Sequence, residues 1–420
     1  MLKALVLLSG GLDSMLAVKV LQEQGVEVVG LSFKSYFFNT ESARKAARQL
    51  GIELMEIDFS DEHLAMVKNP KYGYGKNINP CIDCHAMMFR KAGEFLKNKI
   101  VIPGLTRNPE IVSVVRATTI LDPAPDQVRG DKAAGITKVA NKNMPKNIFD
   151  FIATGEVLGQ RPKSQNKEAL DIVAKYSGVD DLLVRPLSAK LLNKTKPEKD
   201  GRLIRGKLLD IKGRTRQRQV ELARKYGIKE YPSSAGGCIL TDLEFSQRLM
   251  KLFEYWPECD GNDVELIKNG RVLWINAERC GINPSASSGR ARNDAEKLRG
   301  IECGKDASTS PAQARKVMAV IGRNKEECEN LEKLAKKGDI VVELKEEVGP
   351  LTIVRIFNFQ FSIFNEKEII LDIPKELKMS ELRLGEEKSE KEILRIVGLL
   401  TGYYAPKARG KKIKLLITNY

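Results

Sequence analysis

The sequence contains no apolar run of the roughly 18 residues that a membrane-spanning helix needs. Its N-terminus also lacks the basic and then apolar layout of a secretory signal peptide. The chain has only 2 histidines, and its 7 cysteines occur at uneven spacing, which does not indicate a disulfide framework. We therefore expect a cytoplasmic protein with no membrane partner, whose cysteines serve chemistry or packing.

Acidic residues are too few to balance the basic ones, and the formal net charge is +15. The basic residues concentrate in "GKLLDIKGRTRQRQVELARKYGIK" and "YYAPKARGKKIK". An excess of Lys and Arg favours a polyanionic partner, because each neutralised phosphate releases counterions. A generally basic proteome would give the same composition without such a partner.

The first part of the chain alternates strands and helices at short spacing. Strands are expected over 3–8, 26–33, 52–59 and 149–157, and helices over 13–24, 41–51, most of 79–99, 166–177 and 213–226. Such alternation implies right-handed βαβ units. We therefore predict an α/β domain over 1–257, built on a doubly wound parallel sheet.

A smaller α+β domain is expected over 258–420. Its predicted strands are "VELIKNGRVLWI", "KVMAVIGR" and "DIVVEL", its predicted helix is "KEECENLEKLAKKG", and its end is basic. No residue in it forms an obvious catalytic set.

Two stretches, 100–146 and 281–316, interrupt this pattern. The first has scattered prolines and glycines and no sustained period, whereas a helix-to-strand connection normally takes about 2–6 residues. Phrases such as "VIPGLTRNPE" and "NPSASSGRARND" look like translated copies of interspersed DNA repeats. We interpret both as catalytically silent insertions. The alternative for the first is a lid or an RNA-contacting arm. "FNFQFSIFN" (357–365) is either a similar insertion or a real strand.

The string "SGGLDS" follows the first strand directly. Glycines at this corner let the backbone approach a ligand, and a helix N-terminus offers unpaired N–H groups to a phosphate. The backbone at Gly10 and Gly11 would face the phosphate, and the hydroxyls of Ser9 and Ser14 would supply further hydrogen-bond donors. Asp13 would order the loop or hold Mg²⁺. The string is neither a Walker motif nor G-x-G-x-x-G. An ordinary tight turn is the competing interpretation.

This string resembles the PP-loop ATPases, the adenine nucleotide alpha-hydrolase group. The resemblance implies that ATP is cleaved between its α and β phosphates and that AMP is transferred to a carbonyl oxygen of the substrate. "FIATGEVLGQRPKSQ" (151–165), with "LLVRPLSAK" after it, resembles the tRNA 4-thiouridine synthase family. Thr154, Gly155 and Gln160 then join the ATP-binding set, and Arg161 reaches phosphates or the target base. A plain strand-to-helix loop is the alternative.

The cysteines of "NPCIDCH" resemble an element of the tRNA 2-thiouridylases. The resemblance makes Cys84 the sulfur-handling cysteine, with Cys81 at a position commonly held by Asp. Cys238, in "SSAGGCILTD", follows a glycine pair much as the second cysteine of that family does.

Several chemistries fit these three cysteines. In the first, Cys84 or Cys238 carries a persulfide, and the other cysteine resolves the resulting disulfide. In the second, Cys81, Cys84 and Cys238 ligate a [4Fe–4S] cluster. The CxxC spacing slightly favours the cluster. A zinc site with His85 and a set of buried structural cysteines are further alternatives. Cys259, Cys280, Cys303 and Cys328 are interpreted as structural. His63 is interpreted as a helix-face residue, which leaves no catalytic pair of histidine and acid.

The second domain resembles the RNA-binding module of NFACT-type proteins, in "VIGRNKEECENLEKLAKKGDIVVEL" and "GYYAPKARGKKIKLLI". An unrelated basic α+β domain is the alternative. The 4-thiouridine synthases carry an RNA-binding THUMP region before the PP-loop, whereas here the loop begins at residue 9. The C-terminal domain would then bind the RNA in place of a THUMP region.

Together these features predict an ATP-dependent tRNA sulfurtransferase that adenylates a uridine carbonyl oxygen and replaces it with sulfur. The 4-thiouridine type is favoured, and 2-thiolation comes second. ATP, Mg²⁺ and a [4Fe–4S] cluster are the expected cofactors. The expected partners are tRNA and a sulfur donor: a cysteine desulfurase, a sulfur carrier or sulfide. The alternatives are a PP-loop enzyme that amidates or ligates a small molecule and a decayed, non-catalytic RNA-binding protein.

Overall fold

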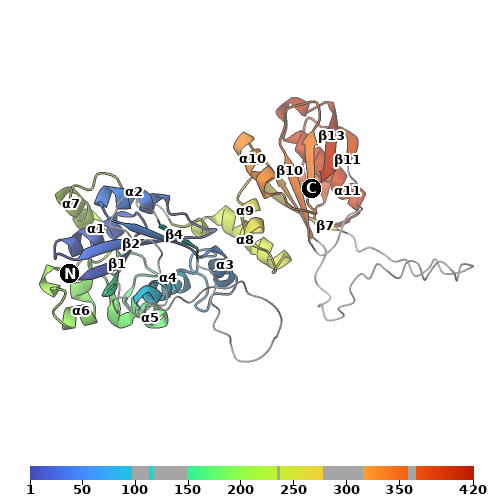
Figure 1. The fold of residues 1–420 in the computed structure, drawn as a ribbon. Helices are drawn as coiled ribbons and strands as arrows, with labels where there is room; N and C mark the ends of the chain where they lie inside the picture. The colour runs from blue at the N-terminus through green and yellow to red at the C-terminus, as the bar shows by residue number, and fades with distance from the viewer. Residues whose placement is uncertain (97–112, 117–148, 234–236, 278–315, 358–365) are drawn as a thin grey trace, which may run out of the picture. The chain divides into compact units, whose positions relative to one another are not determined.

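A computed structural model describes residues 1–96, 113–116, 149–233, 237–277, 316–357 and 366–420 (Figure 1). The chain divides into two compact units, Met1–Ser246 and Gln247–Tyr420. The sequence places this division after residue 257, beyond helix α8 (Leu243–Tyr255), through which the division runs. Among the residues given above, no helix has both the length and the apolar character needed to cross a membrane.

The predicted insertions 100–146 and 281–316 lie outside the described residues, apart from strand β4 (Ser113–Arg116) and Lys316, the first residue of β8 (Lys316–Ile321). The stretch 357–365 also lies outside them after Phe357. Their interpretation as insertions stays a prediction.

The first unit is built on a six-stranded sheet in the order β4-β3-β2-β1-β5-β6. Its other strands are β1 (Lys3–Leu7), β2 (Glu27–Lys34), β3 (Leu54–Asp58), β5 (Phe151–Thr154) and β6 (Leu183–Val184). Every neighbouring pair is parallel. The predicted α/β class with a parallel sheet is therefore confirmed.

Helices cover both faces of this sheet (Figure 1). One face packs against α1 (Leu12–Gln22), α2 (Glu41–Leu50) and α7 (Gln217–Lys225), and the other against α4 (Cys81–Leu96) and α5 (Lys167–Ser177). Helix α3 (Ser60–Lys68) contacts α4, and α6 (Lys196–Lys199) is a single turn. The pattern in α2 shows why such helices form, because Ala43, Ala46, Ala47 and Leu50 recur at helical spacing and are all buried.

The chain leaves β1 toward β2, β3 and β4 on one side, and β5 and β6 are added on the other side. Strand order therefore reverses between β1 and β5, and open α/β sheets bind ligands at the carboxyl ends of strands flanking such a point. The loops after these strands are Leu8–Gly11 and Gly155–Asn166. They carry the two motifs singled out in the sequence.

Two glycines let these loops approach neighbouring backbone closely. Gly10 has φ of +80°, and a Cβ on it would lie 2.3 Å from the backbone carbonyl of Ser42. A Cβ on Gly155 would lie 2.4 Å from the Asp13 carbonyl carbon and the Ser14 nitrogen. Backbone therefore meets backbone at both places, with no room for a side chain.

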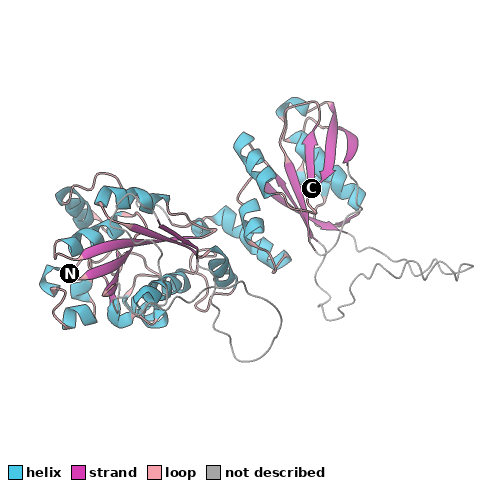
Figure 2. Cartoon of the chain, in the orientation of Figure 1, coloured by secondary structure: helices cyan, strands magenta, loops and turns pink. Residues whose placement is uncertain are grey.

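The second unit contains a seven-stranded mixed sheet in the order β11-β13-β9-β10-β8-β7-β12 (Figure 2). Its strands besides β8 are β7 (Arg271–Ala277), β9 (Ile340–Leu344), β10 (Thr352–Ile356), β11 (Glu366–Asp372), β12 (Glu387–Lys388) and β13 (Lys412–Asn419). Helix α11 (Glu390–Tyr403) buries Ile393, Leu394 and Val397 against the sheet. The unit also contains α9 (Gly261–Leu266) and α10 (Lys325–Leu334). The predicted α+β character is confirmed.

One predicted strand of this unit is wrong in its first half. "VELI" lies at the end of α9 and just after it, and the strand β7 begins only at Arg271. Asp260 accepts a hydrogen bond from the Asp263 backbone N–H at 3.0 Å, and Asp263 accepts one from Asp260 at 2.9 Å. This capping box favours a helix start over the β propensity of the apolar letters.

A substitution of Gly10 by alanine tests the close approach of the loop after β1 to α2. We expect Gly10→Ala to lower the free energy of unfolding by about 2 to 4 kcal/mol, because it adds left-handed strain and a backbone clash. Gly206→Ala is the matched control, since no atom lies within 4 Å of a Cβ at that position. Urea denaturation of both variants is the measurement. Equal stability of the two variants would contradict the packing.

Candidate functional site

A cavity of about 350 Å³ lies where the carboxyl ends of β1 and β5 meet. Its volume lies within the range of small-molecule sites. The lining includes the predicted residues Ser9, Gly11, Asp13, Ser14, Thr154, Gly155, Gln160, Arg161, Cys81, Cys84 and Cys238. Gly10 belongs to the same loop but packs against Ser42 behind it. The structure therefore places the two motifs and the three cysteines around one space.

The loop after β1 presents the start of α1 to this cavity. Gly11 is the N-cap of α1, and no side chain caps the first turn. The Ser14 hydroxyl donates to the Gly11 carbonyl at 2.7 Å, and the Gly11 N–H donates to the Ser9 hydroxyl at 3.4 Å. Uncapped N–H groups at a helix N-terminus suit an anion such as a phosphate.

Asp13 is held from two later segments of the chain. Gln160 donates to its Oδ2 atom at 2.7 Å, and the Arg216 guanidinium pairs with the same oxygen at 2.9 Å. The Oδ1 atom is buried and has no hydrogen-bond partner among the described residues. A buried carboxylate oxygen without a donor fits a divalent cation at this place. The sequence motifs do not indicate Arg216, which lies just before α7.

The loop after β5 carries a buried carboxylate. Glu156 accepts from Arg185 Nε at 2.8 Å through one oxygen and pairs with His85 Nδ1 at 2.9 Å through the other. Burial alone raises the pKa of a carboxyl, but the charge of Arg185 and the hydrogen bond with His85 outweigh it and lower the pKa of Glu156 to about 2. Glu156 is therefore a carboxylate at neutral pH.

The prediction that the chain has no catalytic pair of histidine and acid stays a prediction, but the structure does bring a histidine and an acid into contact here. His85 is the fifth residue of α4 and Glu156 lies after β5, so 71 positions separate them. The two motifs "DCH" and "TGE" contain both residues, but only the parallel sheet brings them into contact.

Asn79 connects two of the cysteines. The Cys81 thiol donates to Asn79 Oδ1 at 2.6 Å, and Asn79 Nδ2 donates to Cys238 Sγ at 3.6 Å. Cys84 Sγ instead lies 3.2 Å from His63 Nε2. Cys81 and Cys238 therefore share Asn79, whereas Cys84 is paired with His63.

His63 lies on a face of helix α3, as predicted, but it also contacts one of the cavity cysteines. His63 is fully buried, stacks on Phe59, and binds Ser35 through Nδ1 at 2.7 Å. Burial lowers the pKa of His63 to about 3, so this histidine is neutral where it meets Cys84. Sequence reasoning missed it because the contact joins α3 to α4.

The three cysteines do not form a metal centre in the part of the chain that the structure describes. No group of three His, Cys, Asp or Glu residues there is arranged to hold a metal ion. The expected [4Fe–4S] cluster and the zinc alternative therefore find no support in the geometry. Of the remaining cysteines, Cys259 is buried in the second unit, the Cys328 sulfur accepts from the Leu351 N–H at 3.4 Å, and Cys280 and Cys303 lie outside the described residues.

Burial keeps the cavity thiols protonated. It raises the pKa of Cys238 to about 11, and it also raises the pKa values of Cys81 and Cys84 above the ordinary thiol range. A thiolate therefore has to be generated when ligands or a sulfur donor arrive.

Comparisons with known proteins find similarity in the first part of the chain. Residues 2–102 match the family model described as the tRNA methyl transferase HUP domain. The chain is 38% identical over 104 residues to the tRNA-specific 2-thiouridylase MnmA of Sulfurimonas denitrificans, covering 23% of this chain and 30% of that protein. It is 36% identical over 91 residues to the tRNA-specific 2-thiouridylase MnmA 3 of Bacteroides fragilis, covering 20% and 24%. The chain thus spans less than a third of the length of these curated relatives.

Two solved structures are also similar to parts of the chain. A predicted subunit of tRNA methyltransferase from Methanocaldococcus jannaschii matches at 18% identity with a TM-score of 0.20, covering 26% of this chain and 60% of that chain. NMN synthetase from Francisella tularensis matches at 13% identity with a TM-score of 0.19, covering 56% and 89%.

The raised thiol pKa predicts slow alkylation in the protein without ligands. At pH 8, Cys238 is expected to react with iodoacetamide about 100-fold more slowly than glutathione, because far less of it is thiolate. Its rate is expected to rise about tenfold for each pH unit up to pH 10. Peptide mass spectrometry of time points gives the rate at each cysteine. A rate for Cys238 equal to that of glutathione at pH 8 would show that the thiol is not desolvated.

Proposed function

We propose that this protein is an ATP-dependent tRNA sulfurtransferase. The observation that carries the proposal is the meeting of the "SGGLDS" loop and three cysteines in one cavity. A phosphate-binding loop suits nucleotide activation, and cysteine sulfur suits the second half of a thiolation. The similarity of residues 2–102 to the HUP domain and to tRNA-specific 2-thiouridylases supports the same combination.

In the first step a uridine carbonyl oxygen attacks the α-phosphorus of ATP, and pyrophosphate leaves. The start of α1, with Ser9, Gly11 and Ser14, is placed to hold phosphate oxygens. Mg²⁺ would bind at the unpartnered oxygen of Asp13 and neutralise phosphate charge. Arg216, now paired with Asp13, is a second cation within reach of the phosphates. The step turns a poor leaving oxygen into a phosphate ester of AMP.

In the second step a cysteine persulfide delivers sulfur. The terminal sulfur attacks the activated carbon, the carbon–oxygen bond breaks, and AMP leaves. The thiolate of another cavity cysteine then attacks the sulfur of the persulfide cysteine, forming a disulfide and releasing the thiolated base. Cys84 and Cys238 are the two cysteines proposed for these roles, with Cys81 as a third. A persulfide donor reloads the enzyme, and an external dithiol reduces the disulfide.

The names of the similar curated proteins favour 2-thiolation of uridine. The curated proteins that match are named tRNA-specific 2-thiouridylases, whereas the text of 151–165 resembles 4-thiouridine synthases. Because the matches cover the segment that carries the PP-loop and the CxxC, we place 2-thiouridine formation first and 4-thiouridine formation second.

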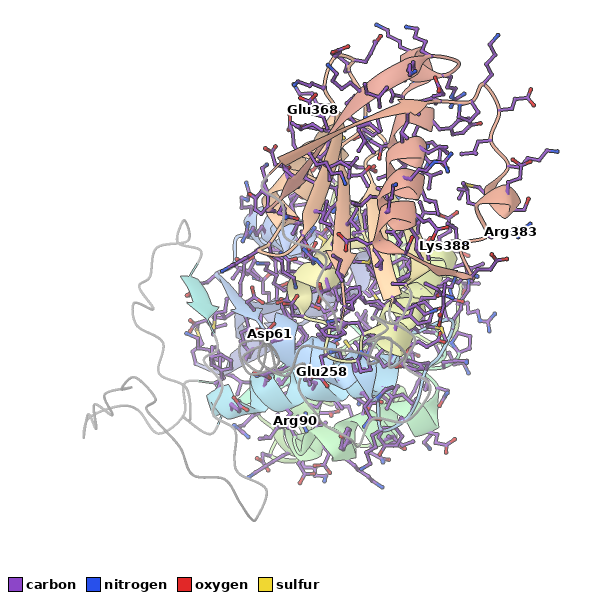
Figure 3. All side chains as sticks on the ribbon, turned by 90° about the vertical axis from the view of Figure 1, so that its right-hand side faces the viewer. Asp61, Arg90, Glu258, Glu368, Arg383 and Lys388 are labelled. Atoms are coloured by element: carbon purple, nitrogen blue, oxygen red, sulfur yellow. The ribbon has the colours of Figure 1, made fainter. Side chains whose placement is uncertain are left out.

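The second unit is proposed to contact the RNA, as its likeness to NFACT-type modules suggests. Lys407, Arg409, Lys411 and Lys412 are exposed before and at the start of β13. Arg409 lies over the Tyr403 ring at 4.5 Å, which pairs a cation with an aromatic face. The exposed side chain of Arg383 projects from this unit (Figure 3). Such groups bind phosphates without reading bases.

An assay with unmodified tRNA transcripts, Mg·ATP and a persulfide donor tests the proposal. We expect one AMP for each thiolated nucleoside, which mass spectrometry of RNA digests identifies. Cys84→Ser is expected to lose at least about 100-fold in thiolation, because no other group replaces the sulfur. Cys328→Ser, outside the cavity, is the matched control and is expected to keep full activity.

Other outcomes would contradict parts of this account. Release of AMP and pyrophosphate only with a small amine would indicate an amidating enzyme. RNA binding without any use of ATP would indicate a non-catalytic protein. A brown protein after anaerobic purification, whose absorption is lost in Cys81→Ala, would replace the persulfide with an iron–sulfur cluster.

A further inference from the structure

His85 presents one edge of its imidazole ring to the cavity. The other edge of the ring is held by a hydrogen bond. Its Nδ1 atom lies 2.9 Å from Glu156 Oε1, and the second oxygen of Glu156 is held by Arg185. His85 lines the cavity together with Cys84 and the loop after β1. No hydrogen bond to His85 Nε2 occurs among the described residues.

This geometry decides which nitrogen of the neutral ring carries the proton. A carboxylate only accepts hydrogen bonds, so the proton must be on Nδ1. Nε2 is then left with a lone pair and acts as an acceptor. The buried Arg185 keeps Glu156 ionised, which fixes this tautomer.

The other acid and base groups of the described cavity are engaged elsewhere, apart from the Oδ1 atom of Asp13, which is the oxygen proposed to hold Mg²⁺. Asp13 is engaged by Gln160 and Arg216, and His63 contacts Cys84 through Nε2. The three thiols are protonated, and Arg161 and Arg216 are donors without acceptor capacity. The Nε2 atom of His85 is therefore a free acceptor beside the sulfur-bearing cysteines.

We propose that His85 accepts a hydrogen bond from N3–H of the target uridine and takes up that proton when the base is adenylated. This inference rests on the proposed function. Uridine presents a donor at N3, whereas cytidine presents an acceptor there, so the same contact selects uridine. N3 lies between both carbonyl groups of the ring, and the contact therefore serves 2-thiolation and 4-thiolation alike.

The proton balance of the reaction needs such a group. As the carbonyl oxygen bonds to phosphorus, the N3–H electrons form a carbon–nitrogen double bond, and the proton moves to His85 Nε2. The imidazolium is stabilised by the Glu156 carboxylate behind it. When sulfur adds and AMP leaves, the proton returns to N3, so His85 ends as it began. Glu156 is the positioning residue in this step, and His85 touches the base.

The tautomer is testable without any activity, because the chain has only 2 histidines. In histidine-selective ¹⁵N-labelled protein at neutral pH, we expect one ring with the proton on Nδ1, assigned to His85 by its loss in His85→Gln. In Glu156→Gln the new amide N–H donates to Nδ1, and the proton is expected to move to Nε2. A wild-type His85 ring with its proton on Nε2 would overturn the inference.

The role in base selection is tested on tRNA, with single-turnover AMP release as the readout. Once the wild type has identified the thiolated uridine, transcripts carry uridine or 3-deazauridine there, which lacks the N3–H donor. The wild type is expected to bind the uridine form about tenfold more tightly. His85→Ala is expected to lose this preference and most AMP release, and His85→Gln, which keeps an acceptor, to recover part of both.

These experiments distinguish failure of the proposed function from failure of the role proposed for His85. If wild-type protein neither thiolates tRNA nor releases AMP with it, the proposed function fails. If wild-type protein is active but His85→Ala keeps the tenfold preference, the function stands and the inference fails. A purely structural role would lower binding of both transcripts equally and leave their ratio unchanged.

Discussion

The contact between Gly155 and the start of α1 is the constraint on which the site depends. Backbone meets backbone there, so the loop after β5 is fixed against the loop after β1 and the start of α1 without any intervening side chain. The parallel neighbours β1 and β5 set the distance between the two loops. Glu156, one residue later, is thereby carried to α4, where it meets His85. The loop after β1 and helix α4 are thus connected through this one approach.

Charged side chains of the cavity are paired with one another. Glu156 is neutralised by Arg185, Asp13 by Arg216, and the thiols stay protonated through burial. A low dielectric strengthens each of these interactions and penalises any charge left alone. On the proposed function, an incoming polyphosphate would compete with Asp13 for Arg216. The unpartnered Asp13 oxygen indicates where a cation would restore the balance.

Short sequence patterns predict the helices, the strands and the loops between them. They do not predict contacts between residues that are far apart in the sequence. The apolar strands, Gly51 as a helix end and the "SGGLDS" corner are all readable within a few residues. The contacts of His85 with Glu156 and of Arg216 with Asp13 span 71 and 203 positions, and they exist only because strand order reverses at β1. The helix α9 was missed for a local reason, since its capping box competes with apolar letters that favour a strand. The contact of His63 with Cys84 was not predicted, because a histidine in a helix gives no sign of the sulfur that faces it from another helix.

Transfer of an isotope tests the central claim, that the base oxygen is activated in the same cavity that delivers sulfur. The target uridine is labelled with oxygen-18 at its carbonyl oxygens, and the AMP released during thiolation is analysed by mass spectrometry. The account predicts that the AMP contains one oxygen-18 atom for each thiolated base, because the oxygen leaves bonded to phosphorus. AMP free of the label, with thiolated RNA formed, would contradict adenylation of the base.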